Sequence, residues 1–296
     1  MTTHPPIDAA ALAADYWSTS IIDIHPGSIK MRGYPIEELI GNVSFPQMIW
    51  LMLRGELPEP RAARLFEAAL VASVDHGPHA PSIAISRMAV SCGLPLNGAM
   101  ASAINALDDV HGGAGQQAVE LYDAIARRVE HGLELEDAVE EEVDAFIAAR
   151  GKYLPGFGHR FHPVDPRAVR LLALVDEAVS AGVVQGKYAS IARGVEALLK
   201  RRKHRPVPMN IDGATAVIYG ELGFAAELAR GVFCLSRAVG ILSHAWEQRG
   251  RHERNKGPMP RQLPYRYTGA PERHLSDLAD TEAATGGATD DPLRNV

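Results

Sequence analysis

The chain has 296 residues, 46% of them apolar and 22% charged, so it can bury a sizeable core in one or two domains. Its net charge of −6 excludes a global basic field that would attract nucleic acid. No uninterrupted apolar run reaches the ~18 residues of a membrane helix, and the N-terminal residues do not resemble a secretory signal. Two cysteines without a CxxC spacing are typical of a reducing compartment, so we expect a cytoplasmic protein.

The first elements combine extended chain and helix. Residues 18–33 alternate apolar and polar side chains around a Pro-Gly pair, which predicts a short β-hairpin. A strongly apolar helix is expected from Phe45, and Gly55 is expected to end it. The next helix begins near Pro60, and one apolar stripe along it is predicted to face the core: Ala62, Leu65, Phe66, Ala69 and Val71.

The rest of the chain is predicted to be helical up to about residue 251. Helical patterns cover residues 80–93, 96–110, 117–130, 134–150, 165–182, 188–202 and 225–250. In the fifth of these, Asp165 is expected to cap the helix and Pro166 to occupy its first position. Residues 208–223 form an extended-to-helix junction. The predicted fold class is therefore all-α, with one short N-terminal β-hairpin.

Three loops between helices contain more than the helix cap and the glycine that such a connection requires. They are residues 110–117 (VHGGAGQQ), 154–167 (LPGFGHRFHPVDPR) and 210–217 (NIDGATAV). In the first two, glycines beside His111 and His159 let the backbone approach a ligand. In the third, Asp212 precedes a small-residue helix whose dipole favours the ionised carboxylate. Each joint has a structural alternative, namely a flexible turn with an exposed histidine or, for Asp212, an ordinary N-cap.

Together these residue types indicate a chemistry. A carboxylate base and two imidazoles can abstract a weakly acidic C–H proton and stabilise the enolate that forms. Arginines bind substrate carboxylates by bidentate pairing, and two arginines stand near these loops. Arg167 begins the helix after His159, and Arg237 lies on an otherwise apolar helix, where a charge is costly unless it is paired.

The motifs HGGAG, LPGFGHR with DPR, NIDG and LSRAVG occur in this order at nearly even spacing, which resembles the citrate synthase superfamily. The stretch RGYPIEEL before an apolar helix is also similar to the N-terminal region of that family, so the resemblance covers about residues 18–269. It implies a homodimer of mostly helical subunits, each with a large domain and a smaller domain inserted in it. The implied divisions are 1–112 and 223–270 for the large domain, 113–222 for the small domain and 271–296 for a poorly ordered tail.

The resemblance implies catalytic roles for three residues. His111 is similar to the histidine that hydrogen-bonds the thioester oxygen of acetyl-CoA as it enolises. Asp212 is similar to the base that removes the methyl proton. His159 is similar to the histidine that acts on the oxaloacetate carbonyl.

The resemblance also implies the binding residues. Those similar to oxaloacetate-binding residues are His76, Arg167 and Arg237. Those expected to contact coenzyme A are Pro155, Gly156, Phe157, Gly158, Lys200 and Arg201, the last two within a basic cluster that continues through Lys203 and Arg205. A solvated surface patch is the alternative for that cluster. The coenzyme A thioester is a substrate, and neither a tightly bound cofactor nor a metal is implied.

Two departures from the family pattern are informative. Met259 stands where citrate synthases carry an arginine contributed across the dimer, and Arg261 and Arg266 are the candidates to replace it. Gly213 follows the predicted catalytic aspartate, where citrate synthases generally have an aromatic residue. The NIDG motif is more similar to citryl-CoA lyases and to the C-terminal part of ATP-citrate lyase. His244 in LSHAWEQ also resembles that subgroup, or it is a core histidine.

The leading expectation is an enzyme that cleaves citryl-CoA to acetyl-CoA and oxaloacetate, or runs the condensation. Citrate synthase or 2-methylcitrate synthase, which add thioester hydrolysis, are the first alternative. A non-catalytic relative that binds CoA or a dicarboxylate is the second. The sequence contains no GxxxxGK[ST] loop, so a lyase would receive citryl-CoA from a separate enzyme.

Overall fold

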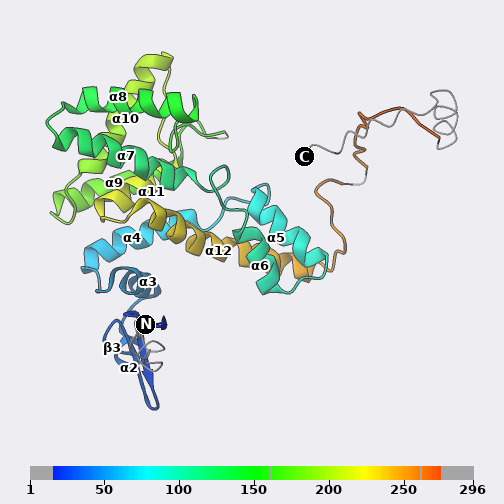
Figure 1. Ribbon diagram of the computed structural model, residues 1–296, viewed down its shortest axis with the longest axis horizontal. Helices are drawn as coiled ribbons and strands as arrows, with labels where there is room; N and C mark the ends of the chain where they lie inside the picture. Colours follow the sequence, from blue (N-terminus) through cyan, green and yellow to red (C-terminus); the bar gives the residue numbers. More distant parts are fainter. Residues whose placement is uncertain (1–15, 161, 261, 275–296) are drawn as a thin grey trace, which may run out of the picture. The chain divides into compact units, whose positions relative to one another are not determined.

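The computed structural model describes residues 16–160, 162–260 and 262–274, and it is mostly helical with a small sheet near the N-terminus (Figure 1). The described residues up to Lys256 form one compact unit, and those from Gly257 belong to a second. The predicted division of residues 1–270 into large and small domains stays a prediction. The predicted tail, 271–296, lies outside the described residues from 275 onward. Among the residues that the structure describes, no helix is both long and apolar enough to cross a membrane.

The predicted β-hairpin is present and is extended by a third short strand. Strands β1 (Ile22–His25) and β2 (Ser28–Met31) are antiparallel, and Gly27 in the turn has a φ of 78°. Strand β3 (Tyr34–Pro35) pairs with β2 and leads into α2 (Ile36–Leu39). The sequence pattern did not predict β3, because two residues are too few to show an alternation.

The remaining helices follow the predicted order. They are α3 (Phe45–Arg54), α4 (Pro60–Ser73), α5 (Pro81–Ser91), α6 (Leu96–Ile104), α7 (Ala114–Glu130), α8 (Leu135–Arg150), α9 (Pro166–Ser180), α10 (Lys187–Lys203), α11 (Ile211–Glu221) and α12 (Ala226–Gly250). Local chemistry explains several ends. Gly55 ends α3 in the left-handed conformation, and the Asp165 side chain caps α9 by accepting from the Arg167 N–H.

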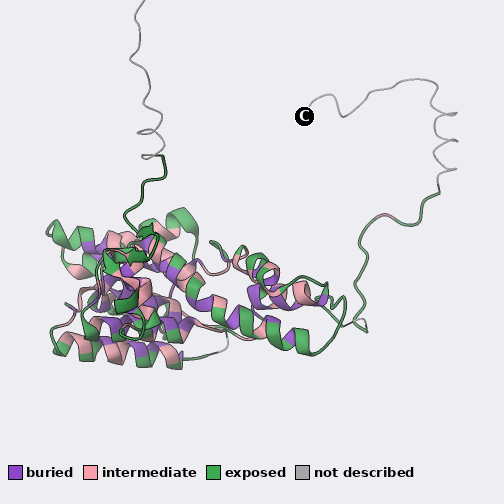
Figure 2. Ribbon diagram, turned by 90° about the horizontal axis from the view of Figure 1, so that it is seen from below, coloured by how far each residue is buried: buried purple, intermediate pink, exposed green. Residues whose placement is uncertain are grey.

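The long helix α12 lies between two groups of helices in Figure 1. Helices α4 and α7–α11 bury one large apolar cluster, while α5, α6 and α12 bury a smaller one around Ile83 and Ile241. Figure 2 shows the buried residues where the helices face one another and the exposed residues on their outer sides. The predicted α4 stripe is confirmed at Leu65 and Phe66 and wrong at Val71, which is 64% exposed because it faces away from that core.

Candidate functional site

Arg237 on α12 lies at the centre of the predicted site residues. Its side chain is only 6% exposed, its Nε donates to the Ser73 carbonyl at 3.1 Å, and its guanidinium stacks 4.9 Å from the Phe233 ring centroid. Burial is the largest influence on the pKa of His111 and of Asp212, and the charge of Arg237 acts on both of these pKa values and on that of His76. The structure therefore gathers side chains from segments far apart in the sequence around this one arginine.

The start of α5 holds His111 in one tautomer. The Ser82 N–H donates to His111 Nε2 at 3.1 Å, and Ser82 Oγ lies 2.9 Å from the same nitrogen. Because a backbone N–H only donates, Nε2 carries no proton and the proton resides on Nδ1. Burial lowers the pKa of His111, and Arg237 lowers it further. His111 therefore presents Nδ1–H as the donor of a neutral imidazole.

The glycines beside His111 are required by packing within the protein. A Cβ at Gly112, where φ is 100°, would lie 3.0 Å from the Phe233 ring. At Gly113 it would lie 2.7 Å from the Asp109 backbone. Arg230 on α12 also pairs with the Asp109 carboxylate. The close approach in the structure is to α12 and to the turn itself, and the predicted approach to a ligand stays a prediction.

The loop before His159 pairs with the segment that enters α11. The Gly158 N–H donates to the Pro208 carbonyl at 2.7 Å, and the Asn210 N–H donates to the Gly156 carbonyl at 2.9 Å. Asn210 Nδ2 also donates to the Gly158 carbonyl at 2.7 Å, while its Oδ1 accepts from the Asp212 N–H at 2.9 Å. One asparagine thus ties the loop of His159 to the helix turn that carries Asp212.

Gly156 and Gly213 touch where these two segments meet. A Cβ at Gly213 would lie 2.4 Å from the Gly156 carbonyl oxygen, and a Cβ at Gly156 would lie 2.7 Å from the Gly213 Cα. Gly156 also has a φ of 83°, a conformation that favours glycine. The glycine after Asp212, which the sequence marks as a departure from citrate synthases, is therefore required by this backbone contact.

His159 faces both His162 and His76. The His162 N–H donates to His159 Nδ1 at 3.1 Å, so the proton of the neutral ring resides on Nε2. The ring centroids of His159 and His76 are 5.9 Å apart, and His76 is exposed. Burial lowers the pKa of His159, an effect that Asp165 opposes and that His162 and Arg167 reinforce.

Asp165 joins the predicted substrate arginine to α11. Its side chain is buried, and its two oxygens accept from Arg167 Nε and Nη2, each at 2.9 Å. Oδ2 also accepts from the Ile211 N–H at 3.0 Å. Burial alone would raise the pKa of Asp165, but these hydrogen bonds outweigh burial and hold that pKa below its ordinary value. Sequence reasoning treated Asp165 only as a cap; the DPR spacing was the signal of its pairing with Arg167.

Asp212 lies in the first turn of α11 with a carboxyl group of altered acidity. The helix dipole favours the ionised form, as the sequence predicts, but burial dominates and raises the pKa of Asp212. Arg237 and Arg167 oppose this rise, whereas Asp165 adds to it. A carboxylate with a raised pKa is a stronger base, so Asp212 is suited to removing a proton.

A basic pocket of about 500 Å³ opens beside His159. Its lining includes Phe157 and Gly158 of the glycine loop and four cationic side chains: Lys152, Arg160, Lys203 and Arg205. Of the other residues predicted to contact coenzyme A, Pro155 and Gly156 are buried behind this loop, outside the lining. Lys200 is exposed and also outside the lining, and Arg201 forms an ion pair with Glu136 at 2.6 Å.

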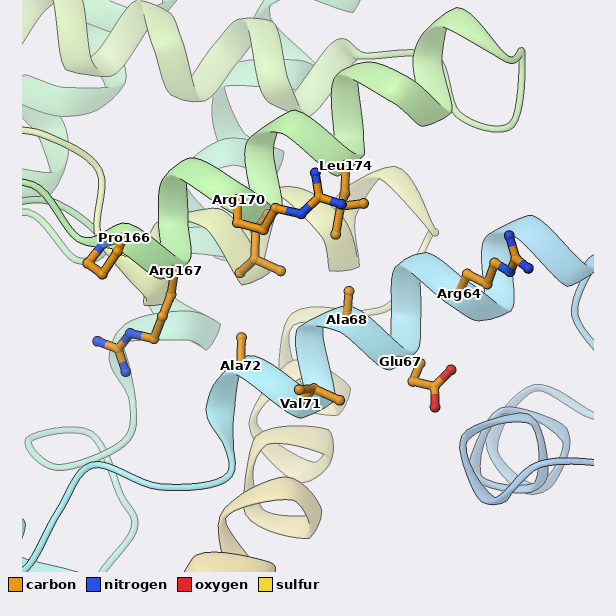
Figure 3. A pocket seen from close by; sticks show the side chains of 10 residues that line it. Arg64, Glu67, Ala68, Val71, Ala72, Pro166, Arg167, Arg170 and Leu174 are labelled. Atoms are coloured by element: carbon orange, nitrogen blue, oxygen red, sulfur yellow. The ribbon is translucent and has the colours of Figure 1, made fainter.

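A second hollow, an apolar groove of about 600 Å³, lies between α4 and α9 (Figure 3). Ala68, Val71 and Leu174 line it, and Arg167 lies at the end near Ala72. Apart from Arg167, none of the predicted site residues lines this groove. Within the described ranges, no group of three or more His, Cys, Asp or Glu side chains is arranged to bind a metal ion.

The residues discussed as a replacement for the missing arginine belong to the second unit. Met259 is 60% exposed, and Arg266 is also exposed. Arg261 lies outside the described residues.

Three comparisons identify relatives. The chain matches the family described as "Citrate synthase, C-terminal domain" over residues 9–62 and 58–261. Citrate synthase of Haloferax volcanii is 32% identical over 221 residues, which cover 74% of this chain and 53% of that protein. The chain thus spans about half the length of the curated relatives it matches.

Solved structures share the fold. Citryl-CoA lyase from Hydrogenobacter thermophilus aligns with a TM-score of 0.77 and 33% identity, covering 89% of this chain and 99% of that one. Citrate synthase from Thermoplasma acidophilum, in a ternary complex with carboxymethyl coenzyme A and oxaloacetate, aligns with a TM-score of 0.63 and 25% identity over 80% of this chain and 60% of that one. The predicted fold class is confirmed, and the chain belongs to the citrate synthase family.

Proposed function

We propose that this protein breaks or forms the carbon–carbon bond between an acyl-CoA and a 2-oxo dicarboxylate, and that its leading reaction is cleavage of citryl-CoA to acetyl-CoA and oxaloacetate. One observation carries the proposal. A carboxyl group with a raised pKa, Asp212, shares the surroundings of Arg237 with a neutral His111 that presents a hydrogen-bond donor. These are the groups that enolisation of a thioester requires.

The proposed reaction is simplest to follow in the direction of condensation. The Asp212 carboxylate removes a methyl proton from the acyl-CoA, and the enolate oxygen accepts a hydrogen bond from His111 Nδ1–H. The enolate carbon attacks the carbonyl carbon of the 2-oxo acid, whose oxygen accepts a hydrogen bond from His159 Nε2–H and takes a proton from water to become a hydroxyl group. Cleavage is the reverse: the hydroxyl gives its proton to water, the carbon–carbon bond breaks, and the Asp212 carboxylic acid returns a proton to the enolate carbon.

We assign the carboxylates of the 2-oxo acid to Arg167, Arg237 and His76. The buried guanidinium of Arg237 and the Asp165-oriented guanidinium of Arg167 support this assignment. A fixed guanidinium binds a carboxylate with two parallel hydrogen bonds and loses little side-chain entropy.

The coenzyme A portion is proposed to occupy the basic pocket beside His159. Its phosphates would meet Lys152, Arg160, Lys203 and Arg205, and the pantetheine chain would pass Phe157 and Gly158. Lys203 and Arg205 are better placed for this role than Lys200 and Arg201, which do not line the pocket. The thioester is a substrate here, and no tightly bound cofactor takes part in the proposal.

Condensation followed by thioester hydrolysis, as in citrate synthase, is the second candidate. The curated relatives at 28–32% identity are named citrate synthase, which favours it. The contact between Gly156 and Gly213 and the 33% identity to a citryl-CoA lyase favour cleavage.

The proposed compartment is the cytoplasm, where Cys92 and Cys234, both free thiols, would stay reduced.

The test is a substrate panel. Purified protein is mixed with citryl-CoA, and oxaloacetate is measured; acetyl- and propionyl-CoA are then offered with oxaloacetate, pyruvate and glyoxylate. Release of oxaloacetate from citryl-CoA supports cleavage, whereas condensation with release of free thiol supports the synthase. Asp212→Asn should abolish both, while Asp137→Asn on the exposed face of α8 should match the native protein. No turnover in any arm at high enzyme concentration refutes the proposal.

We also propose that two copies associate through α12. Leu235, Val239, Leu242 and Trp246 are 40–63% exposed and recur along one side of this helix. Sedimentation should show a dimer, and Trp246→Glu should yield monomers; a monomeric native protein contradicts the proposal. As a lyase, the dimer would receive citryl-CoA from a separate citryl-CoA-forming enzyme.

A further inference from the structure

A hydrogen-bonded network of polar side chains, in which Arg87 and Gln248 are buried, connects α5 and α12 outside the residues assigned to the reaction. Arg87 on α5 is 9% exposed, and its Nε donates to Gln248 Oε1 at 3.1 Å. Its Nη1 donates to Glu247 Oε2 at 3.2 Å and lies 3.1 Å from His244 Nδ1. His244 Nε2 in turn lies 3.3 Å from Asp75 Oδ2. This hydrogen-bond network therefore links α5, α12 and the turn after α4.

The hydrogen-bond roles along this chain are determined by its ends. A guanidinium has no acceptor, so Arg87 can only donate, and His244 Nδ1 must accept. The proton of the His244 ring then resides on Nε2, where it is donated to the Asp75 carboxylate. Asp75 also accepts from the Gly77 N–H at 3.2 Å. Each hydrogen bond from Arg87 through His244 to Asp75 thus has one donor and one acceptor, and together these bonds hold the His244 ring in one orientation.

The turn that receives this chain carries His76. The carbonyl of Ser73, the last residue of α4, accepts from Arg237 Nε at 3.1 Å, and Asp75 follows two residues later in the turn. Gly240 on α12 lets the turn approach: a Cβ there would lie 2.2 Å from the Val74 carbonyl oxygen and 3.0 Å from Asp75 Oδ1. The two residues proposed to bind the 2-oxo acid from this side, His76 and Arg237, are therefore held through the same short turn.

We propose that His244 and Arg87 are positioning residues for the 2-oxo acid, acting through Asp75 on the placement of His76 beside Arg237. The inference rests on the proposed function for its substrate and on the hydrogen-bond chain for its mechanism. An imidazole with one acceptor and one donor suits a position between an obligatory donor and a carboxylate. Losing it leaves Arg87 and Asp75 without their link, so the turn is no longer held in register with α12.

The kinetic test compares two replacements of one residue. His244→Leu removes both hydrogen bonds, whereas His244→Gln keeps an acceptor and a donor at the end of the side chain. In the condensation assay, we expect His244→Leu to raise the KM for oxaloacetate about tenfold or more and to change the KM for acetyl-CoA by less than about twofold. His244→Gln should recover most of the native KM. Equal changes in both KM values, or no rescue by glutamine, overturn the proposal.

A matched control separates positioning from loss of stability. Val143→Ala removes a fully buried methyl pair in α8, far along the chain from this network, and should lower Tm without changing either KM. If Val143→Ala raises the KM for oxaloacetate as His244→Leu does, the effect is one of stability and the positioning role is refuted.

A spectroscopic readout tests the network even if none of the panel substrates turns over. In protein labelled with ¹⁵N-histidine, His244 should show an unprotonated Nδ1 and a protonated Nε2. In Arg87→Met, His244 Nδ1 should no longer be held unprotonated. Both Arg87→Met and His244→Leu should shift the His76 ring signals. A His244 ring protonated at Nδ1, or His76 signals unmoved by either variant, overturns the proposal.

Discussion

His111 and His159 are both held as neutral imidazoles, yet the contacts that hold them come from different distances along the chain. His111 Nε2 accepts from the backbone of Ser82, at the start of a helix that precedes it by 29 residues. His159 Nδ1 accepts from the backbone of His162, three residues further on. The two neutral rings consequently carry their proton on opposite nitrogens, Nδ1 in His111 and Nε2 in His159.

The difference divides the site into two halves. The half with His111 is attached to α5 and α12, through Ser82 and through the pairing of Arg230 with Asp109. The half with His159 is attached to Asp212, because the glycine loop and the entry to α11 are hydrogen-bonded together. A substitution that loosens the half with His159 should therefore displace His159 and Asp212 together. A substitution that loosens the half with His111 should displace His111 alone.

Among variants that keep the proposed catalytic side chains, the largest effect is expected from Asn210→Ala. This change removes the bond from Nδ2 to the Gly158 carbonyl and the cap on the Asp212 N–H, so it loosens both members of one half. A misplacement of about 1 Å can cost on the order of a hundredfold in rate, and we expect kcat/KM to fall by at least about that factor. Steady-state kinetics on citryl-CoA, or on the condensation, measures it.

Ser44→Ala is the control for that variant, since Ser44 also caps a helix, α3, but lies outside the site. Both variants lose a cap worth about 1 kcal/mol of stability. Only Asn210→Ala should lose activity; a similar kcat/KM for the two variants would contradict the shared role of Asn210.

Gly213→Ala should damage the same half by overpacking. The added Cβ would lie 2.4 Å from the Gly156 carbonyl oxygen, so the two segments must separate. Overpacking of this kind costs about 1–3 kcal/mol, and thermal unfolding should show a lower Tm together with reduced kcat. Gly231→Ala, where the new Cβ meets nothing within 4 Å, is the control and should keep the native Tm or raise it. An unchanged Tm in Gly213→Ala would mean that the contact is not close in solution.

Much of the fold could be predicted because helix periods and caps are local. The α9 cap at Asp165 and the stop of α3 at Gly55 follow from residues within one turn. Val71 was assigned to the core because apolar periodicity in α4 is broad, and only the packing of neighbouring helices decides which edge is covered. Strand β3 was missed because its pairing with β2 depends on a turn and not on a pattern.

The candidate site could be proposed from its residue types, whereas the connections between its residues could not be predicted from the sequence. Histidines and an aspartate beside glycines marked the loops, and the spacing in DPR placed Arg167. The partner of His111, Ser82, comes from another helix, and no local signal relates the two residues. The pKa of Asp212 likewise depends on burial among several helices, which outweighs the helix dipole that the sequence makes visible.

The pH dependence should report the neutral state of both histidines. Burial lowers the pKa of His111 and of His159 below the ordinary value of 6.5, so each ring stays neutral at a lower pH than a free imidazole. Since protonation would turn the accepting nitrogens into donors, both rings should titrate with midpoints below pH 6.5. A pH titration of the ring signals in ¹⁵N-histidine-labelled protein measures this separately from Asp212, whose raised pKa would also shape a profile of kcat/KM. A midpoint at or above 6.5 for either ring would show that burial does not govern it.

The smallest effect is expected from Ser82→Ala, which tests how the His111 half is held. The hydroxyl lies 2.9 Å from Nε2 and is lost, but the backbone N–H at 3.1 Å remains and still requires an unprotonated Nε2. One neutral hydrogen bond contributes about 1 kcal/mol, so kcat should fall by roughly three- to tenfold. His111→Ala, which removes the ring itself, should cost about a hundredfold or more in the same assay. If Ser82→Ala lowers kcat as much as His111→Ala does, the Ser82 hydroxyl and not the backbone at the start of α5 orients the ring. Both halves of the site would then depend on side chains.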